Sequence, residues 1–118
     1  MTANTQFIPS TSEPIADMGT MVAINLAREA IQSTKCLTIQ YGGHDRVVEV
    51  HAVGITKDGN PIVKAWQVSG KSNGNGPSPW KHFRLDRASH ISLSDQDSEA
   101  PRDSYVPDRS IFVILTQI

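Results

Sequence analysis

Short runs of alternating apolar and polar residues, separated by turn-forming residues, make up most of this chain. In the first run Leu37, Ile39 and Tyr41 fall on one side, which is the two-residue period of a half-buried strand. Turn sequences such as 57–60, with its Asp-Gly pair, lie between runs and favour hairpins. The same criteria predict strands over residues 36–41, 46–55, 61–68, 80–87, 90–93 and 111–117. The pattern therefore predicts a mainly β protein.

One amphipathic helix is predicted ahead of the strands, over residues 21–34, with Thr20 as its N-cap. Apolar residues recur on one side of it at helical spacing, at Ala23, Leu26, Ala27, Ala30 and Ile31. Such a helix has to pack against another element, and the sheet that follows is the simplest partner.

The length of 118 residues allows one domain with one modest core. We predict a flexible arm over residues 1–19 and a single domain over residues 20–118. A five-stranded sheet of this size tends to curl into a small barrel, because closure removes exposed edges. The apolar run 111–115 then forms an extra C-terminal strand that is buried on both sides or covered by the helix.

Charge is distributed unevenly along the chain, although the formal net charge is only −1. Residues 36–93 contain seven Lys or Arg and four acids, whereas residues 94–118 contain two Lys or Arg and five acids. A mildly basic body with an acidic flank is able to bind an anion locally. The acidic stretch 94–109, which contains two prolines, is predicted to be a solvated excursion.

Several classes of site and location are not expected. Cys36 is the only cysteine, so no internal disulfide forms, and a small core residue is its expected role. The histidines have no metal-ligand spacing, and no nucleophile or carboxylate pair is recognisable, so neither a metal, a cofactor nor an enzyme is expected. No signal peptide or membrane span is recognisable, which leaves a cytoplasmic protein as the expectation.

A cluster of basic and aromatic residues is the best candidate binding site. Guanidinium groups bind phosphate in a bidentate manner, and aromatic rings stack on bases. The predicted ligand-binding residues are Tyr41, Arg46, Trp66, Trp80, Lys81, Arg84 and Arg87. In a regular strand Lys81 and Arg84 point to opposite faces. The alternative is that Arg84 or Arg87 pairs with an acid, Asp86 or Glu49, and that Trp66 fills the core.

The loop over residues 70–79 is rich in Gly, Ser, Asn and Pro and is long for a hairpin. Its Gly70-Lys71-Ser72 is similar to the end of a phosphate-binding motif, but Ala65 stands where that motif needs glycine. We interpret it as a flexible loop whose Lys71 could close over a ligand.

Several of these residues occur in the order of a known family. Tyr41 ends the first strand, Arg46 opens the second, and the closing pattern 81–87 reads Lys-His-Phe-Arg-Leu-Asp-Arg. Over about residues 21–93 the chain resembles the WYL domain, a small Sm-like barrel found mostly in bacterial transcription regulators. The name-giving Trp-Tyr-Leu is replaced by Pro61-Ile62-Val63, and His51 replaces a usual proline.

The resemblance implies a sensor of nucleic acid or nucleotide-like ligands. Together with the basic cluster, it predicts a non-enzymatic, regulatory ligand-binding module for a nucleotide, including a cyclic one, or for short single-stranded nucleic acid. The alternative is a protein-interaction or oligomerisation module, in which residues 111–115 add a strand to a partner protein or to another copy.

Overall fold

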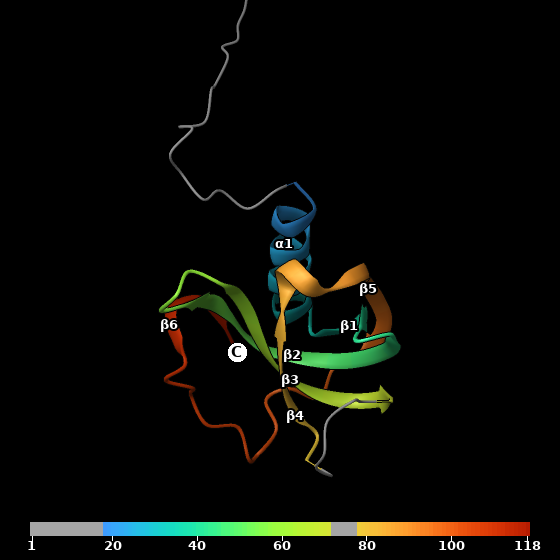
Figure 1. Ribbon diagram of the computed structural model, residues 1–118. Helices are drawn as coiled ribbons and strands as arrows, with labels where there is room; N and C mark the ends of the chain where they lie inside the picture. The colour runs from blue at the N-terminus through green and yellow to red at the C-terminus, as the bar shows by residue number, and fades with distance from the viewer. Residues whose placement is uncertain (1–17, 72–77) are drawn as a thin grey trace, which may run out of the picture.

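The computed structural model describes residues 18–71 and 78–118, and Figure 1 shows their arrangement. The elements in chain order are α1 (Met18–Ser33), β1 (Lys35–Tyr41), β2 (His44–Thr56), β3 (Pro61–Gly70), β4 (Trp80–Arg84), the 3₁₀ helix η1 (Leu85–Arg87), β5 (Ser89–Asp97) and β6 (Ile111–Gln117). This confirms a mainly β fold with one N-terminal helix. The predictions for residues 1–17 and 72–77 lie outside the described residues.

The long strand β2 is the centre of the antiparallel sheet. One of its edges pairs with β3, and the other pairs first with β1 and then with β6. The strand order is β4-β3-β2-β1-β5, with β6 beside the C-terminal half of β2. Within the described residues β4 and β5 pair only on their inner sides, so the sheet is open there. Closure into an Sm-like barrel stays a prediction.

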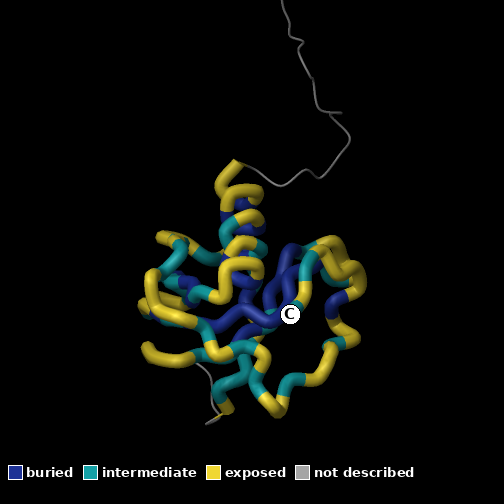
Figure 2. The backbone as a smooth tube through the Cα atoms, turned by 180° about the vertical axis from the view of Figure 1, so that it is seen from behind, coloured by how far each residue is buried: buried dark blue, intermediate teal, exposed yellow. Residues whose placement is uncertain are grey.

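Helix α1 covers one face of the sheet and forms the main core with it. Small side chains let the helix approach closely, and Ala27 has no exposed surface. The largest fully buried side chains opposite it include Leu37, Phe83 and Leu85. The dark backbone in Figure 2 runs through the base of the helix and the middle of the sheet. The predicted apolar stripe of the helix is therefore the surface that the core uses.

The opposite face, which we call the outer face, is covered by the β5–β6 segment (residues 98–110). In Figure 1 this segment runs below the sheet, whereas α1 lies above it. It was expected to be a solvated excursion that begins at residue 94. Instead β5 continues to Asp97, and the segment after it makes side-chain contacts with β2, β3 and β4. Long-range polar pairing, which local composition does not reveal, holds it there.

Two predicted element boundaries also differ from the structure. The helix begins at Met18, so Thr20 lies inside it and is buried, rather than capping it. The predicted strand 80–87 stops at Arg84 and continues as η1. This turn places Leu85 in the core beneath α1 and reverses the chain into β5.

The apolar run 111–115 was predicted to be buried, and this is wrong for all but its first residue. Ile111 is buried with Ala52 and Ile62 in a small satellite cluster. The four that follow are exposed, by 68% for Phe112, 45% for Val113, 42% for Ile114 and 38% for Leu115. Strand β6 lies at the side of the sheet in Figure 1, and these four side chains stay at the surface.

Gly54 allows β6 to approach β2, and an alanine there is expected to weaken that pairing. A Cβ at this position would overlap the Ile111 side chain and the Val113 carbonyl. We expect Gly54→Ala to lower the free energy of unfolding by about 1–3 kcal/mol, the usual range for overpacking. It should also speed amide hydrogen exchange in β6. The control Ser69→Ala, on an exposed part of β3, should stay within about 0.5 kcal/mol of wild type. Equal stability of both variants would contradict the tight β2–β6 contact.

Candidate functional site

Arg46, the first of the predicted ligand-binding cations, is buried and already bonded. Its Nε and Nη2 donate to the Tyr41 carbonyl at 3.2 and 2.9 Å, and its Nη1 donates to Gln67 Oε1 at 3.3 Å. The guanidinium carbon lies 5.6 Å from the Tyr41 ring centre and 5.3 Å from that of Phe83. Burial lowers the pKa of Arg46. The Arg46 guanidinium is therefore bonded to the protein's own groups and has a structural role.

The other three cations do not gather around Arg46. Arg84 pairs with Asp86, its Nη2 lying 2.6 Å from Oδ2, as the alternative interpretation had it. This hydrogen bond raises the pKa of Arg84 and lowers that of Asp86. Lys81 shares a strand face with Phe83, opposite to Arg84. The side chains of Lys81 and Arg87 form no hydrogen bond or ion pair with the described residues.

The predicted aromatic residues are brought together on the outer face, but their rings are covered. Trp66 and Trp80 meet edge to face, with ring centres 5.3 Å apart. The Trp80 indole N–H donates to Ser104 at 3.0 Å, and the Tyr105 ring lies 5.9 Å from it. Lys64 places its ammonium 5.4 Å from the Trp80 ring centre. These rings are therefore already in contact with the β5–β6 segment and a neighbouring lysine.

A buried ion pair holds the β5–β6 segment to β2. Glu49 is only 1% exposed, although it lies in the middle of the sheet. Its carboxylate accepts two hydrogen bonds from Arg102, at 2.7 and 3.1 Å, and one from the Glu99 amide at 2.8 Å. The Arg102 guanidinium also lies 4.6 Å above the Trp66 ring centre. A buried carboxylate is expensive unless its oxygens are satisfied in this way.

His51 is the second anchor of this segment. Its Nδ1–H donates to the Glu49 carbonyl at 2.9 Å, and its Nε2 accepts the Arg102 amide at 3.0 Å. Since Nε2 is an acceptor, this arrangement requires the neutral ring. Burial lowers the pKa of His51 and favours the same form. The Trp80 and Tyr105 rings lie 4.7 and 5.1 Å from the imidazole.

Asp108 anchors the end of the segment that leads into β6. It contacts His82, and it lies 3.7 Å from the Lys64 ammonium. It also accepts the amide and hydroxyl of Ser110 at 2.8 and 2.7 Å. Burial raises the pKa of Asp108, but the hydrogen bonds from Ser110 and His82 outweigh it, so the net shift is downward. The carbonyl of Asp108 accepts the Ile111 amide at 3.2 Å, which starts β6.

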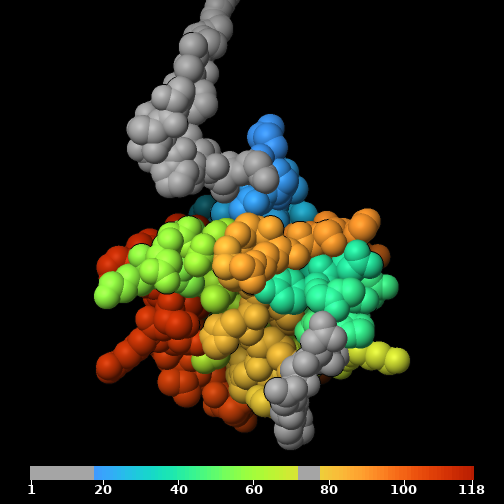
Figure 3. Space-filling view, in the orientation of Figure 1, coloured from blue at the N-terminus to red at the C-terminus, as the bar shows by residue number. Residues whose placement is uncertain are grey.

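Strand β6 presents the most unusual surface of the described chain. Its inner edge pairs with β2, and no described strand pairs with its outer edge. Residues 112–115 are consecutive, apolar and exposed, and the C-terminal residues form one side of the molecule in Figure 3. Natural proteins usually protect an edge of this kind with charge, proline or a covering element. We call residues 111–117 the β6 edge.

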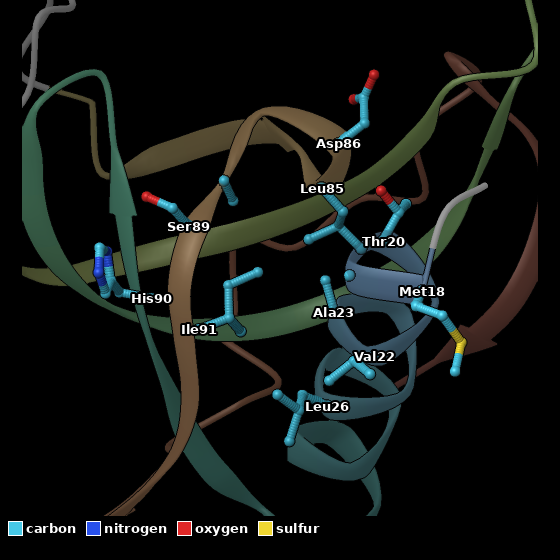
Figure 4. A pocket seen from close by; sticks show the side chains of 12 residues that line it. Met18, Thr20, Val22, Ala23, Leu26, Leu85, Asp86, Ser89, His90 and Ile91 are labelled. Atoms are coloured by element: carbon cyan, nitrogen blue, oxygen red, sulfur yellow. The ribbon is translucent and has the colours of Figure 1, made fainter.

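An open cavity of about 580 Å³ lies between α1, η1 and β5, as Figure 4 shows. Its wall is mainly apolar, with Val22, Leu26 and Ile91 among the lining residues. Asp86 and His90 are the lining residues with ionisable side chains. None of the predicted ligand-binding residues lines it.

Sequence reasoning missed the residues that organise the outer face, which are Glu49, His51, Arg102 and Asp108. Glu49 and His51 interrupt a valine-rich run, and a charge in such a strand is a signal that a partner must exist. Arg102 is more than 50 residues away in the chain, and nothing local identifies it as that partner.

Residues 18–71 and 78–118 contain no group of three or more His, Cys, Asp or Glu placed to hold a metal ion. They also contain no helix long and apolar enough to cross a membrane.

The Glu49–Arg102 pair is expected to contribute strongly to stability. We expect Arg102→Gln to lower the free energy of unfolding by about 3 kcal/mol, because the Glu49 carboxylate then stays buried without its counter-charge. Chemical denaturation measures this. Arg109→Gln is the matched control, since Arg109 is exposed on the same segment, and it should change stability by less than about 0.5 kcal/mol. Similar losses for both variants would show that the pair is not the anchor.

The buried neutral His51 predicts a loss of stability in mild acid. Unfolded His51 takes up a proton near its ordinary pKa of 6.5, whereas folding lowers that pKa. The unfolded state therefore binds more protons below pH 6.5, and stability falls there by up to about 1.4 kcal/mol per pH unit. The carboxylates with lowered pKa values lose their contribution only in stronger acid.

Denaturation between about pH 7.5 and 5.5 tests this linkage. His51→Gln should flatten the dependence, whereas His90→Gln, on the exposed start of β5, should leave it unchanged. An equal slope in wild type and His51→Gln would contradict the assignment.

A comparison of the chain with protein-family models, with curated proteins and with solved structures found no match.

Proposed function

We propose that this chain is a non-enzymatic protein-interaction module that binds its partner by strand addition at the β6 edge. One observation carries the proposal: four consecutive large apolar side chains, 38 to 68% exposed, lie on a strand whose outer edge pairs with no described strand. A run of exposed apolar residues of this length is unfavourable in a folded protein unless it serves a function such as binding. The β6 edge offers both kinds of contact that strand addition uses.

In strand addition, backbone hydrogen bonds supply most of the affinity and side-chain contacts supply the specificity. The unpaired N–H and C=O groups of an edge bond to the incoming strand, while side chains pack on alternate faces. Phe112 supplies an aromatic ring and Val113 a β-branched side chain, which are favourable in cross-strand pairs. A strand of seven residues is a small contact, below the roughly 1,200 Å² of a standard interface. The proposed interaction is therefore weak and reversible.

A phosphate-bearing ligand is a second candidate function. The side chains of Lys81 and Arg87 form no hydrogen bond or ion pair with the described residues, although the Arg87 charge helps to lower the pKa of Asp86, so both charges are available to an anion. Tyr41 contacts both Arg46 and Arg84, since its ring lies 5.6 Å from the Arg46 guanidinium carbon and its hydroxyl accepts the Arg84 backbone amide at 3.2 Å. The Arg84 guanidinium, however, is bonded to Asp86. The similarity to WYL domains favours a nucleotide or single-stranded nucleic acid and a regulatory role. The buried state of Arg46 and the Arg84–Asp86 pair place this candidate second.

A labelled peptide of alternating Val and Thr is a suitable probe of the β6 edge, because it has high strand propensity and carries no charge. We expect wild type to bind it and Val113→Lys to weaken binding at least tenfold, or about 1.4 kcal/mol. Fluorescence anisotropy measures the binding. The matched control is Val68→Lys: Val68 in β3 is 37% exposed, against 45% for Val113, but lies away from β6.

Two outcomes would decide against the β6 edge. One is equal weakening by Val68→Lys, and the other is no peptide binding by wild type at any concentration tested. The phosphate-ligand candidate predicts a different pattern, namely salt-sensitive binding of a labelled oligonucleotide that Lys81→Gln weakens and Val113→Lys does not.

A further inference from the structure

We infer that the strand added to the β6 edge is the β6 edge of a second copy, paired antiparallel about a two-fold axis at Ile114. The inference rests on the proposed function and names its partner. Ile114 is the midpoint of Ile111–Gln117, so this register pairs the whole strand with itself. It places Val113 opposite Leu115 of the partner subunit and Ile114 opposite its own copy. The two sheets become one continuous sheet.

The contrast with the other edges of the sheet shows that β6 is built differently. Strand β4 has only five residues and carries Lys81, His82 and Arg84. Strand β5 is rich in Ser and Asp, and its pairing with β1 has two register shifts. Shortness, charge and irregularity are recognised protections against edge pairing. The pairing of β6 with β2 also has two register shifts, but β6 has neither of the other protections: it is seven residues long and has no charge and no proline.

The β6 edge is also held in place before any partner arrives. At one end Ile111 is buried, and at the other the Ile118 amide donates to the His51 carbonyl at 2.8 Å. Arg28 of α1 donates to the Thr116 hydroxyl at 2.9 Å. The strand is thus anchored at both ends while its middle is exposed. A preformed strand loses less conformational entropy on pairing than a flexible one.

Charge favours an identical partner over a charged one. Residues 110–117 contain no ionisable side chain, so antiparallel self-pairing brings no like charges together. Two charges without an ion pair among the described residues lie near the strand: Arg28, whose Nε donates to the Thr116 hydroxyl, and Arg109, which precedes the strand. In the self-paired register the two Thr116 residues are four residues apart along the strands, or about 14 Å at about 3.4 Å per residue. In the antiparallel register the two Ile111 ends of the strand lie about 20 Å apart at about 3.4 Å per residue, and each Arg109 lies beyond its end of the strand. Both distances exceed the Debye length of about 8 Å at physiological salt, so repulsion between the like charges is screened.

Sedimentation of the full chain over a range of concentrations tests for the dimer. We expect a reversible monomer–dimer equilibrium in wild type and in Val68→Lys, and monomer in Val113→Lys at the same concentrations. Leu115→Lys provides a second variant, since this position is also exposed. Circular dichroism confirms that each variant is folded.

Oxidative cross-linking of variants that each carry one added cysteine besides the buried Cys36 tests the register. Ile114→Cys should form a disulfide-linked dimer, because directly opposed side chains in an antiparallel pair lie within disulfide reach. Val113→Cys and Leu115→Cys should cross-link poorly alone and efficiently when mixed. The natural thiol of Cys36 is buried, and burial raises its pKa, so wild type is the non-reacting control.

Each result separates this inference from the proposed function. A wild-type chain that stays monomeric but binds the strand peptide overturns the self-pairing and leaves strand addition standing. A dimer that persists in both lysine variants, or that cross-links equally at all three positions, also overturns it. Failure of both the dimer and the peptide assay removes the proposed function as well.

Discussion

A buried carboxylate in the central strand determines how the second half of this chain is arranged. Glu49 is almost fully enclosed, and an ionised carboxylate without partners costs several kcal/mol in such a place. Arg102 and the Glu99 amide satisfy it, and both come from the segment after β5. The outer face of the sheet therefore has to be covered by that segment. This stretch has an acidic composition typical of a solvated loop, but it forms a structural layer because its Arg102 neutralises the buried Glu49 carboxylate.

The same polar anchoring leads to the apolar edge. From Arg102 the chain crosses the outer face over Trp66 and Trp80 and reaches Asp108, whose carbonyl starts β6. Strand β6 then pairs with the part of β2 that β1 does not reach. Helix α1 reaches this strand through the Arg28–Thr116 hydrogen bond, but the four apolar side chains of residues 112–115 remain at the surface. The exposed edge is thus a product of ion pairing and hydrogen bonding elsewhere, and no mobile element is needed to present it.

The cations that suggested a phosphate site show how one chemistry can serve two purposes. A guanidinium has five donors in a plane and a face that stacks on rings, which suits phosphates and bases. The same properties suit a backbone carbonyl, an amide oxygen and the Tyr41 and Phe83 rings, and these are what Arg46 contacts. Arg84 likewise meets a carboxylate two residues away. Residue type and spacing alone do not distinguish these cases.

The sequence by itself determined the properties that depend on near neighbours: one amphipathic helix, the strands in their order, the turns between them, and Cys36 as a core residue. These follow from periodicity and turn chemistry, which act over a few residues. Only the tertiary structure decided what lies against each face. Alternation shows that a strand has two different faces, but not that Arg102 covers one of them from more than 50 residues away. For the same reason the run 111–115 looked like core in the sequence and is an open edge in the fold, since burial depends on which elements arrive from elsewhere.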